Sequence, residues 1–221
     1  MYSDPFVTPR NIDDKCGEWL TAVYRHLRPR SGFVLEPSKC ALIVVDMLVY
    51  FANPGGRVYL PSTDAITPRI RKLLDLWRGA GNIVVFTRHC HEGMHDLGML
   101  GKFFGDYIRC DESESEIIPE LQPLPLEKVI RKNTYDAFHN TGLDEYLRDR
   151  AVEQVLVTGV LTQMCCETTA RSAFVRNYEV YIAADALTTS SEDLHVASLM
   201  NLASSVAIVS DTHRICRGEC V

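Results

Sequence analysis

Uninterrupted runs of apolar residues recur along the chain, and segments with helical spacing lie between them. A run that is apolar at every position is typical of a strand covered on both faces, as in a parallel sheet. Five such runs indicate strands at residues 41–45, 83–86, 155–158, 180–183 and 206–209, and a mixed run at 128–131 indicates a sixth. Helical patterns lie at residues 67–78, 141–150, 169–176 and 191–203. This alternation predicts an α/β fold: a doubly wound, mostly parallel six-stranded sheet with helices on both faces, in a Rossmann-like three-layer arrangement.

The strands and helices run on without an obvious linker, so residues 39–215 are predicted to form one domain. Residues 1–38 precede the first strand as an N-terminal extension with one helix, predicted at 13–27, which we expect to pack on the domain or on a partner subunit. Residues 216–221 form a cysteine-containing tail. The glycine- and proline-containing stretch 92–127 is expected to be irregular, with a solvated acidic run.

The composition favours a small-molecule partner. The 221 residues carry a formal net charge of −6 with acids and bases interspersed, which argues against nucleic-acid or acidic-membrane partners. No apolar run reaches the roughly 18 residues that span a bilayer, and the N-terminus does not resemble a signal peptide. These features predict a soluble, cytoplasmic protein.

Eight cysteines are scattered along the chain. Without a secretion signal they are expected to be mostly reduced thiols and not a disulfide framework. Cys216 and Cys220 are spaced so that they could close a small loop or contact a neighbouring chain. No glycine pattern follows a strand and opens a helix, and no P-loop pattern is present, so no nucleotide cofactor is expected.

Three polar residues at the ends of predicted strands are the candidates for chemistry. Cys165 lies at a strand-to-helix turn, where the helix dipole and backbone N–H groups favour a thiolate and an oxyanion. Asp46 follows the first strand and could act as base, its pKa raised by desolvation; Lys132 ends the third and could favour the thiolate. Open α/β sheets gather such strand ends into one crevice. Each residue also has a simpler interpretation: a buried thiol, an Asx turn and a solvated lysine, respectively.

The motifs around these residues resemble the isochorismatase-like cysteine hydrolases, a superfamily with isochorismatases, nicotinamidases and N-carbamoylsarcosine amidases. The resemblance extends from about residue 40 to 210. It rests on Val45-Asp46-Met47, Lys132 within 132–138, Gly159-Val160 with Thr162 and Cys165, Thr169-Ala170, and Ala184-Asp185-Ala186 followed by His195.

The resemblance implies a catalytic triad, with Asp46 as general base and acid, Lys132 as its electrostatic partner and Cys165 as nucleophile. It also implies a cis peptide between Val160 and Leu161, with backbone N–H groups near Leu161 and Cys165 receiving the oxyanion. The expected activity is hydrolysis of a small amide, N-carbamoyl or ureido compound through a thioester. The resemblance further implies a homo-oligomer, a dimer or tetramer.

Departures from the family pattern leave alternatives open. Leu48 stands where the family often has glutamine, which weakens the substrate assignment. Nicotinamidases of the family hold a divalent metal such as zinc with an Asp-x-His pair, and here His89, His91 and His95 occur after the second strand without the expected aspartate. We therefore expect no metal and no cofactor, with these histidines as weak candidate ligands.

Pocket candidates are a cation for a substrate carboxylate and aromatic walls for its body, at Arg88, Phe51, Tyr135 and Phe138. Two other functions remain open. An isochorismatase-type vinyl-ether hydrolase would need Asp46 but no cysteine nucleophile, and a non-catalytic or redox-responsive family member would turn over no amide.

Overall fold

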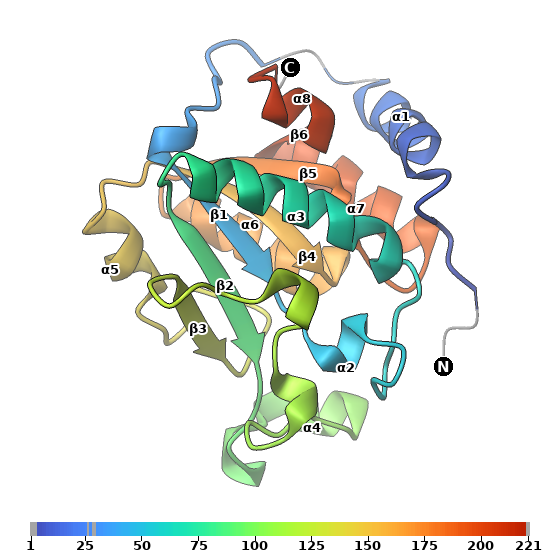
Figure 1. Cartoon of the computed structure of the whole chain (residues 1–221), viewed down its shortest axis with the longest axis vertical. Coiled ribbons are helices and arrows are strands. Elements are labelled where there is room, and N and C mark those ends of the chain that lie inside the picture. The colour runs from blue at the N-terminus through green and yellow to red at the C-terminus, as the bar shows by residue number, and fades with distance from the viewer. Residues whose placement is uncertain (1–3, 26, 28–29, 220–221) are drawn as a thin grey trace.

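A computed structural model describes residues 4–25, 27 and 30–219 (Figure 1). Its centre is a sheet of six strands: β1 (Cys40–Val45), β2 (Val84–His89), β3 (Lys128–Lys132), β4 (Gln154–Val160), β5 (Glu179–Thr188) and β6 (Ala207–Ser210). The strand order is β3-β2-β1-β4-β5-β6, and all neighbouring pairs are parallel. The predicted six-stranded, doubly wound fold is confirmed.

Helices cover both faces of the sheet (Figure 1). The long helix α3 (Thr63–Gly79) and the short α8 (Thr212–Cys216) lie on one face, while α6 (Glu167–Val175) and α7 (Glu192–Ser205) lie on the other. Short helices α2 (Val49–Ala52), α4 (Gly98–Phe104) and α5 (Leu143–Arg148) lie in the connections. None of the described helices is long and apolar enough to cross a membrane.

The two central strands, β1 and β4, are buried at every position, as their apolar runs predict. Their register places Val45 beside Gly159. Gly159 has φ 107°, and a Cβ added there would lie 2.1 Å from the carbonyl oxygen of Val45. Only glycine therefore allows the two strands to approach this closely at their carboxyl ends.

The N-terminal helix α1 spans Ile12–Tyr24 and ends three residues before the predicted end at residue 27. It packs on α7 and β5. Trp19 is buried, donates a 2.7 Å hydrogen bond to Glu192 and contacts the His195 ring edge-on at 4.5 Å. The helix is thus attached to the core by contacts more than 170 residues apart in sequence.

The structure differs from the sequence prediction in one further helix start and in elements that were not predicted. Helix α3 begins four residues before the predicted start and tolerates Pro68 inside it, since only one intrahelical hydrogen bond is lost there. The stretch expected to be irregular contains α4 and three single turns of 3₁₀-helix. Helix α8 was not predicted, because five residues are too few to show a periodicity.

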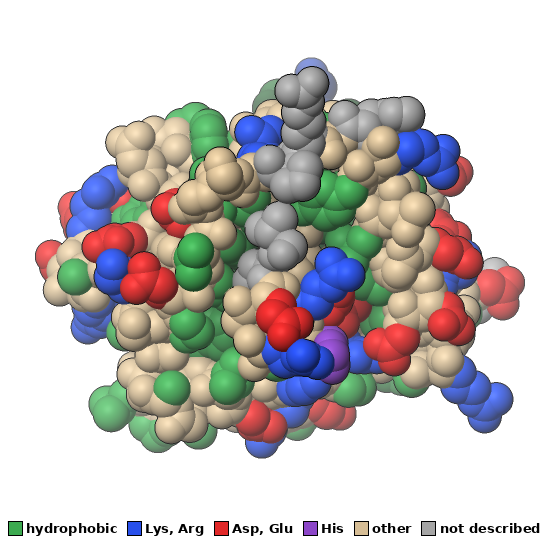
Figure 2. Space-filling view, turned by 90° about the horizontal axis from the view of Figure 1, so that it is seen from above, with side chains coloured by type: hydrophobic (Ala, Val, Ile, Leu, Met, Phe, Trp, Pro, Cys, Tyr) green, Lys and Arg blue, Asp and Glu red, His purple; other side chains and the backbone are tan. Residues whose placement is uncertain are grey.

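The charged surface is mixed in sign. Figure 2 shows Lys and Arg side chains lying among Asp and Glu side chains over the face seen from above. The acidic run 111–116 belongs to this pattern: its carboxylates pair with Arg57, Arg88 and Arg109.

Candidate active site

Cys165 lies just beyond the carboxyl end of β4. The Val160–Leu161 peptide is cis, and the chain then makes one turn of π-helix, Thr162–Cys166, which leads into α6. The Thr162 hydroxyl lies 2.9 Å from Nδ1 of the buried His195, a contact that fixes this turn to α7. Cys165 is 6% exposed and faces the cavity described below, whereas Cys166 is fully buried with its sulfur toward the Thr158 carbonyl.

Asp46 directly follows β1 and adopts a left-handed backbone conformation, φ 47°. Its side chain does not form the Asx turn that its position also allowed. Thr87 Oγ1 donates a 2.6 Å hydrogen bond to Asp46 Oδ1 and accepts one from the Asp46 N–H at 3.1 Å. Because Thr87 lies on the neighbouring strand β2, the carboxylate is held by the sheet itself.

Lys132 ends β3 and is buried rather than solvated. Its Nζ lies 2.6 Å from Asp46 Oδ2 and 3.3 Å from Cys165 Sγ. Three residues from the ends of three strands therefore meet at one point. The sheet order explains this, since β1 and β4 lie side by side where the winding direction of the sheet reverses, which is where α/β proteins form their binding crevice.

The buried ion pair determines where the protons are. Burial raises the pKa of the Cys165 thiol to about 12, although the Lys132 ammonium opposes this. Burial also acts to raise the pKa of Asp46, but the Lys132 ammonium and the Thr87 hydroxyl outweigh it, so this pKa lies below its ordinary value. The resting site holds a carboxylate, an ammonium and a thiol. The expectation of a raised Asp46 pKa was wrong, because the Lys132 ammonium outweighs the effect of burial there. Lys132 does favour the thiolate, as expected, but at Cys165 burial outweighs it.

A cavity of about 250 Å³ opens above Cys165. Its wall is mainly aromatic and aliphatic, and Asp106 is the only carboxylate among its described lining residues, which include neither lysine nor arginine. These residues are Tyr50, Phe51, Val58, His89, His91, Leu100, Phe104, Asp106, Tyr107, Ile108, Tyr135, Leu161, Met164 and Cys165.

One wall of this cavity comes from the segment 100–108, which a disulfide attaches to the sheet. Cys90 follows β2 and is bonded to Cys110, and His91 pairs with Arg109 in a parallel bridge beside it. The expectation of reduced cysteines was wrong for this pair, because the bridge brings their Cα atoms to 4.9 Å. Cys16, Cys165, Cys166 and Cys216 are free thiols, and Cys220 lies outside the described residues.

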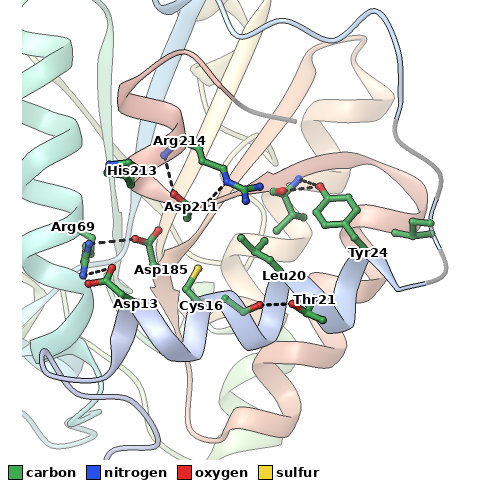
Figure 3. Close-up of a pocket in the computed structure, with 13 residues that line it drawn as sticks. Asp13, Cys16, Leu20, Thr21, Tyr24, Arg69, Asp185, Asp211, His213 and Arg214 are labelled. Atoms are coloured by element: carbon green, nitrogen blue, oxygen red, sulfur yellow. Dashed lines mark hydrogen bonds and ion pairs between the residues drawn. The ribbon is translucent and has the colours of Figure 1, made fainter.

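Figure 3 shows a larger cavity, about 910 Å³, between α1, α3 and the carboxyl ends of β5 and β6. Its buried carboxylate, Asp185, accepts two 2.7 Å hydrogen bonds from Thr212 and lies 3.8 Å from Arg69, which also pairs with Asp13. Burial raises the pKa of the Cys16 thiol that lines it. Because its carboxylates are already paired and its thiol is held protonated, the smaller cavity with the triad is the better candidate for catalysis.

Residues 40–214 match the family model of the Isochorismatase domain, which is more than three quarters of the chain. This chain belongs to the isochorismatase family.

Individual relatives agree with this membership. Nicotinamidase 3 of Arabidopsis thaliana is 39% identical over 180 residues, which cover 80% of this chain and 87% of the relative. The crystal structure of a cysteine hydrolase from Pseudomonas syringae pv. phaseolicola superposes with a TM-score of 0.83 at 31% identity, covering 87% of this chain and 97% of that one. N-carbamoylsarcosine amidase from Thermoplasma acidophilum gives 0.70 at 27% identity, covering 79% and 96%.

The four pocket candidates lie in different places. Phe51 and Tyr135 line the cavity above Cys165. Arg88 does not, because its guanidinium donates to the Ser115 carbonyl and hydroxyl and to Glu116. Phe138 is also absent from the lining and stacks on Tyr178 in the core. The expected cation for a substrate carboxylate is therefore engaged elsewhere.

The residues present do not fit a metal ion. Asp46, His89 and Cys165 each bring one ligand atom within 4.8 Å of the others, which is the spacing of a metal site. The Lys132 ammonium, however, contacts all three, so a cation already occupies the space between them. Among the weak candidates, His91 is hydrogen-bonded to His89, and His95 is exposed to solvent.

Two contacts of the site escaped the sequence interpretation. Thr87 binds Asp46, and His89 Nδ1 lies 3.3 Å from Lys132 Nζ. Both residues lie in the last three positions of β2, the strand beside the one that Asp46 follows. The rule that strand ends meet in one crevice could therefore have indicated them.

Proposed function

We propose that this protein is a cysteine-dependent hydrolase of small, uncharged amides, with Asp46, Lys132 and Cys165 as its catalytic triad. The observation that carries the proposal is the single ammonium placed 2.6 Å from a carboxylate and 3.3 Å from a thiol beneath a cavity. This arrangement provides a nucleophile, a proton acceptor and a charge that stabilises the thiolate as it forms.

The cavity supports the substrate class. Its aromatic and aliphatic walls suit a compact apolar body, and its described lining has no lysine or arginine to pair with a substrate carboxylate. The named relatives include a nicotinamidase and an N-carbamoylsarcosine amidase. Of these two kinds of substrate, an uncharged aromatic amide such as nicotinamide suits the lining better, whereas N-carbamoyl amino acids would need the cation that Arg88 does not provide.

The proposed mechanism is acyl transfer. As Cys165 Sγ attacks the amide carbon, its proton passes to Asp46, and backbone N–H groups near Leu161 and Cys165 receive the oxyanion. Asp46 then protonates the nitrogen, the C–N bond breaks and ammonia leaves a thioester. A water molecule that transfers a proton to Asp46 attacks the thioester, the carboxylic acid leaves, and the proton returns to sulfur. Lys132 keeps its charge throughout.

Ammonia release from nicotinamide and other neutral primary amides tests the proposal, with N-carbamoyl amino acids alongside. Cys165→Ala is expected to lose at least about a thousandfold in kcat/KM, because the covalent step is gone. Cys166→Ala is the matched control and is expected to stay active, since that thiol faces the core. A chelator is expected to have no effect.

The same panel separates the alternatives. Ammonia release that survives Cys165→Ala would refute the covalent mechanism. A folded protein that releases no ammonia from any amide would refute the amidase proposal and favour vinyl-ether hydrolysis with Asp46 as acid, or a non-catalytic role.

We also propose a homo-oligomeric, cytoplasmic protein. Exposed apolar side chains on and before α4 support association between copies: Met94, Met99 and Phe103 are 82%, 70% and 78% exposed. Light scattering after gel filtration measures the mass in solution, and cell fractionation measures the location.

A further inference from the structure

The Lys132 ammonium has more acceptors than protons. Asp46 Oδ2 lies 2.6 Å from Nζ, the Thr134 carbonyl oxygen 3.0 Å, His89 Nδ1 3.3 Å and Cys165 Sγ 3.3 Å. An ammonium donates three hydrogen bonds and accepts none. The triad accounts for two of these contacts and a backbone carbonyl for a third, which leaves the contact with His89 without a role in the proposed mechanism.

The contact with Lys132 dictates the protonation of His89. Lys132 can only donate, so a hydrogen bond between the two side chains requires Nδ1 of His89 to accept and places the ring proton on Nε2. Burial and the ammonium lower the pKa of His89 to about 3, so the ring is neutral. Its Nε2–H lies 3.2 Å from Nε2 of His91, which therefore accepts and carries its own proton on Nδ1, 3.1 Å from the Asp96 carbonyl oxygen.

This hydrogen-bonded chain begins and ends on the same strand. The Asp96 carbonyl also accepts from Asn133 Nδ2 at 3.1 Å, and the Asp96 carboxylate pairs with Arg131. Arg131 and Asn133 flank Lys132, while His89 is its register partner across β2 and β3. Residues at the end of β3 thus bind Asp96, the last member of this row of hydrogen bonds, and His89, its first member, contacts the Lys132 ammonium of the same strand.

We propose that His89 is a positioning residue for the triad: its Nδ1 lone pair holds the Lys132 ammonium between Asp46 and Cys165, and His91 fixes His89 in the tautomer that has this lone pair. The inference rests on the proposed thiol mechanism, in which the ammonium must face sulfur when negative charge develops there. Since both imidazoles also line the cavity, the alternative is that they act by direct contact with substrate.

Two substitutions at one position separate these roles. Asn places its carbonyl oxygen near the position of Nδ1 and keeps an acceptor for Lys132. Gln places its amide near Nε2, which keeps a donor for His91 but removes the acceptor at Nδ1. We expect His89→Gln to lose about ten- to a hundredfold in kcat with KM within about threefold, because this variant loses the hydrogen bond to the charged Lys132 ammonium. His89→Asn keeps that hydrogen bond and is expected to keep kcat within about threefold.

The rate of Cys165 carbamidomethylation by iodoacetamide provides a readout that needs no substrate. We expect wild type and His89→Asn to react faster than His89→Gln, the same order as for kcat, since the ammonium must stabilise the reacting thiolate. An inactive wild type with this order intact would reject the amidase proposal and leave the positioning role standing. Equal kcat losses in both variants, or a rise in KM alone, would overturn the positioning role.

His91→Asn tests the role of the His89 tautomer without changing His89 itself, so the result does not depend on whether the His89 variants fold. Its amide N–H still reaches toward the Asp96 carbonyl, but the acceptor for His89 Nε2–H is lost. We expect a smaller decrease in kcat and in alkylation rate, with urea unfolding midpoints measured for every variant. A folded His91→Asn protein with wild-type values of both would show that His91 does not fix the His89 tautomer.

Discussion

Replacing Lys132 by methionine removes the cation from the site and leaves the shape of the side chain nearly unchanged. Both members of the Asp46–Lys132 pair are completely buried, and their charged atoms are 2.6 Å apart. Coulomb's law with an effective dielectric constant of 20 gives an attraction of about 6 kcal/mol at this distance, part of which desolvation offsets. Removing one partner of a buried pair costs about 3–5 kcal/mol, because the other charge is left without compensation.

We therefore expect Lys132→Met to lower the free energy of unfolding by about 3–5 kcal/mol near neutral pH, a large share of the roughly 5–15 kcal/mol of a typical domain. The loss depends on pH. In the wild type the pKa of Asp46 is lowered, so the pair stabilises the fold above the unfolded-state pKa of about 4. In the variant, burial without the ammonium raises this pKa. The difference between the proteins should thus grow by about 1.4 kcal/mol per pH unit, starting below pH 4 where the wild-type carboxylate ionises in the fold, and level off once the raised pKa of the variant is passed.

Urea unfolding followed by tryptophan fluorescence measures the effect, since Trp19 and Trp77 are both buried. The double variant Asp46→Asn with Lys132→Met removes both charges and is expected to recover at least about half of the loss. Lys128→Met is the matched control: this lysine is exposed on the same strand and should change stability by about 0.5 kcal/mol or less. The reasoning is refuted if Lys132→Met loses under about 1 kcal/mol, or if the double variant shows the summed losses of the two singles.

Three further outcomes are expected. Because burial raises the pKa of Cys165 to about 12, its carbamidomethylation rate should still be rising at about pH 9, and a plateau near neutral pH would contradict this. Gly159→Ala should lose more than about 3 kcal/mol of stability or fail to fold, since its Cβ would meet backbone, whereas Gly17→Ala in α1 should be neutral or stabilising by up to about 1 kcal/mol; thermal melts compare the two. Reducing Cys90–Cys110 with a dithiol should lower stability by about 3 kcal/mol and raise KM more than it lowers kcat, because the bond closes a 20-residue separation that forms one cavity wall; an unchanged KM in the folded, reduced protein would show that the wall holds without it.

Much of the fold was readable from local patterns. The run at 41–45 is apolar at every position and the run at 155–158 at all but Thr158, and such runs are typical of strands covered on both faces, which the structure shows as β1 and β4. The boundaries were less predictable. Helix α3 begins at Thr63, five residues before Pro68, and β5 continues to Thr188. In both cases packing on the sheet compensates for weak local preferences.

The triad members were identifiable because they follow predicted strands, but their protonation was not. A sequence does not show that Cys165 is buried, or that the ammonium lies 2.6 Å from Asp46 and 3.3 Å from Cys165, and burial and these distances together keep the proton on sulfur. Arg88 shows the same limit, since its polarity suggested a substrate contact, and only the folded loop reveals that Ser115 and Glu116 engage it.

The sequence by itself determined which segments become strands and which polar residues stand at their ends, because burial and periodicity are properties of neighbouring residues. Tertiary structure alone decided that Asp46, His89 and Cys165 surround the ammonium of Lys132, and that Cys90 is bonded to Cys110. These contacts join segments that lie 20 or more residues apart, and a side chain's pKa depends on such neighbours far more than on the residues beside it in the chain.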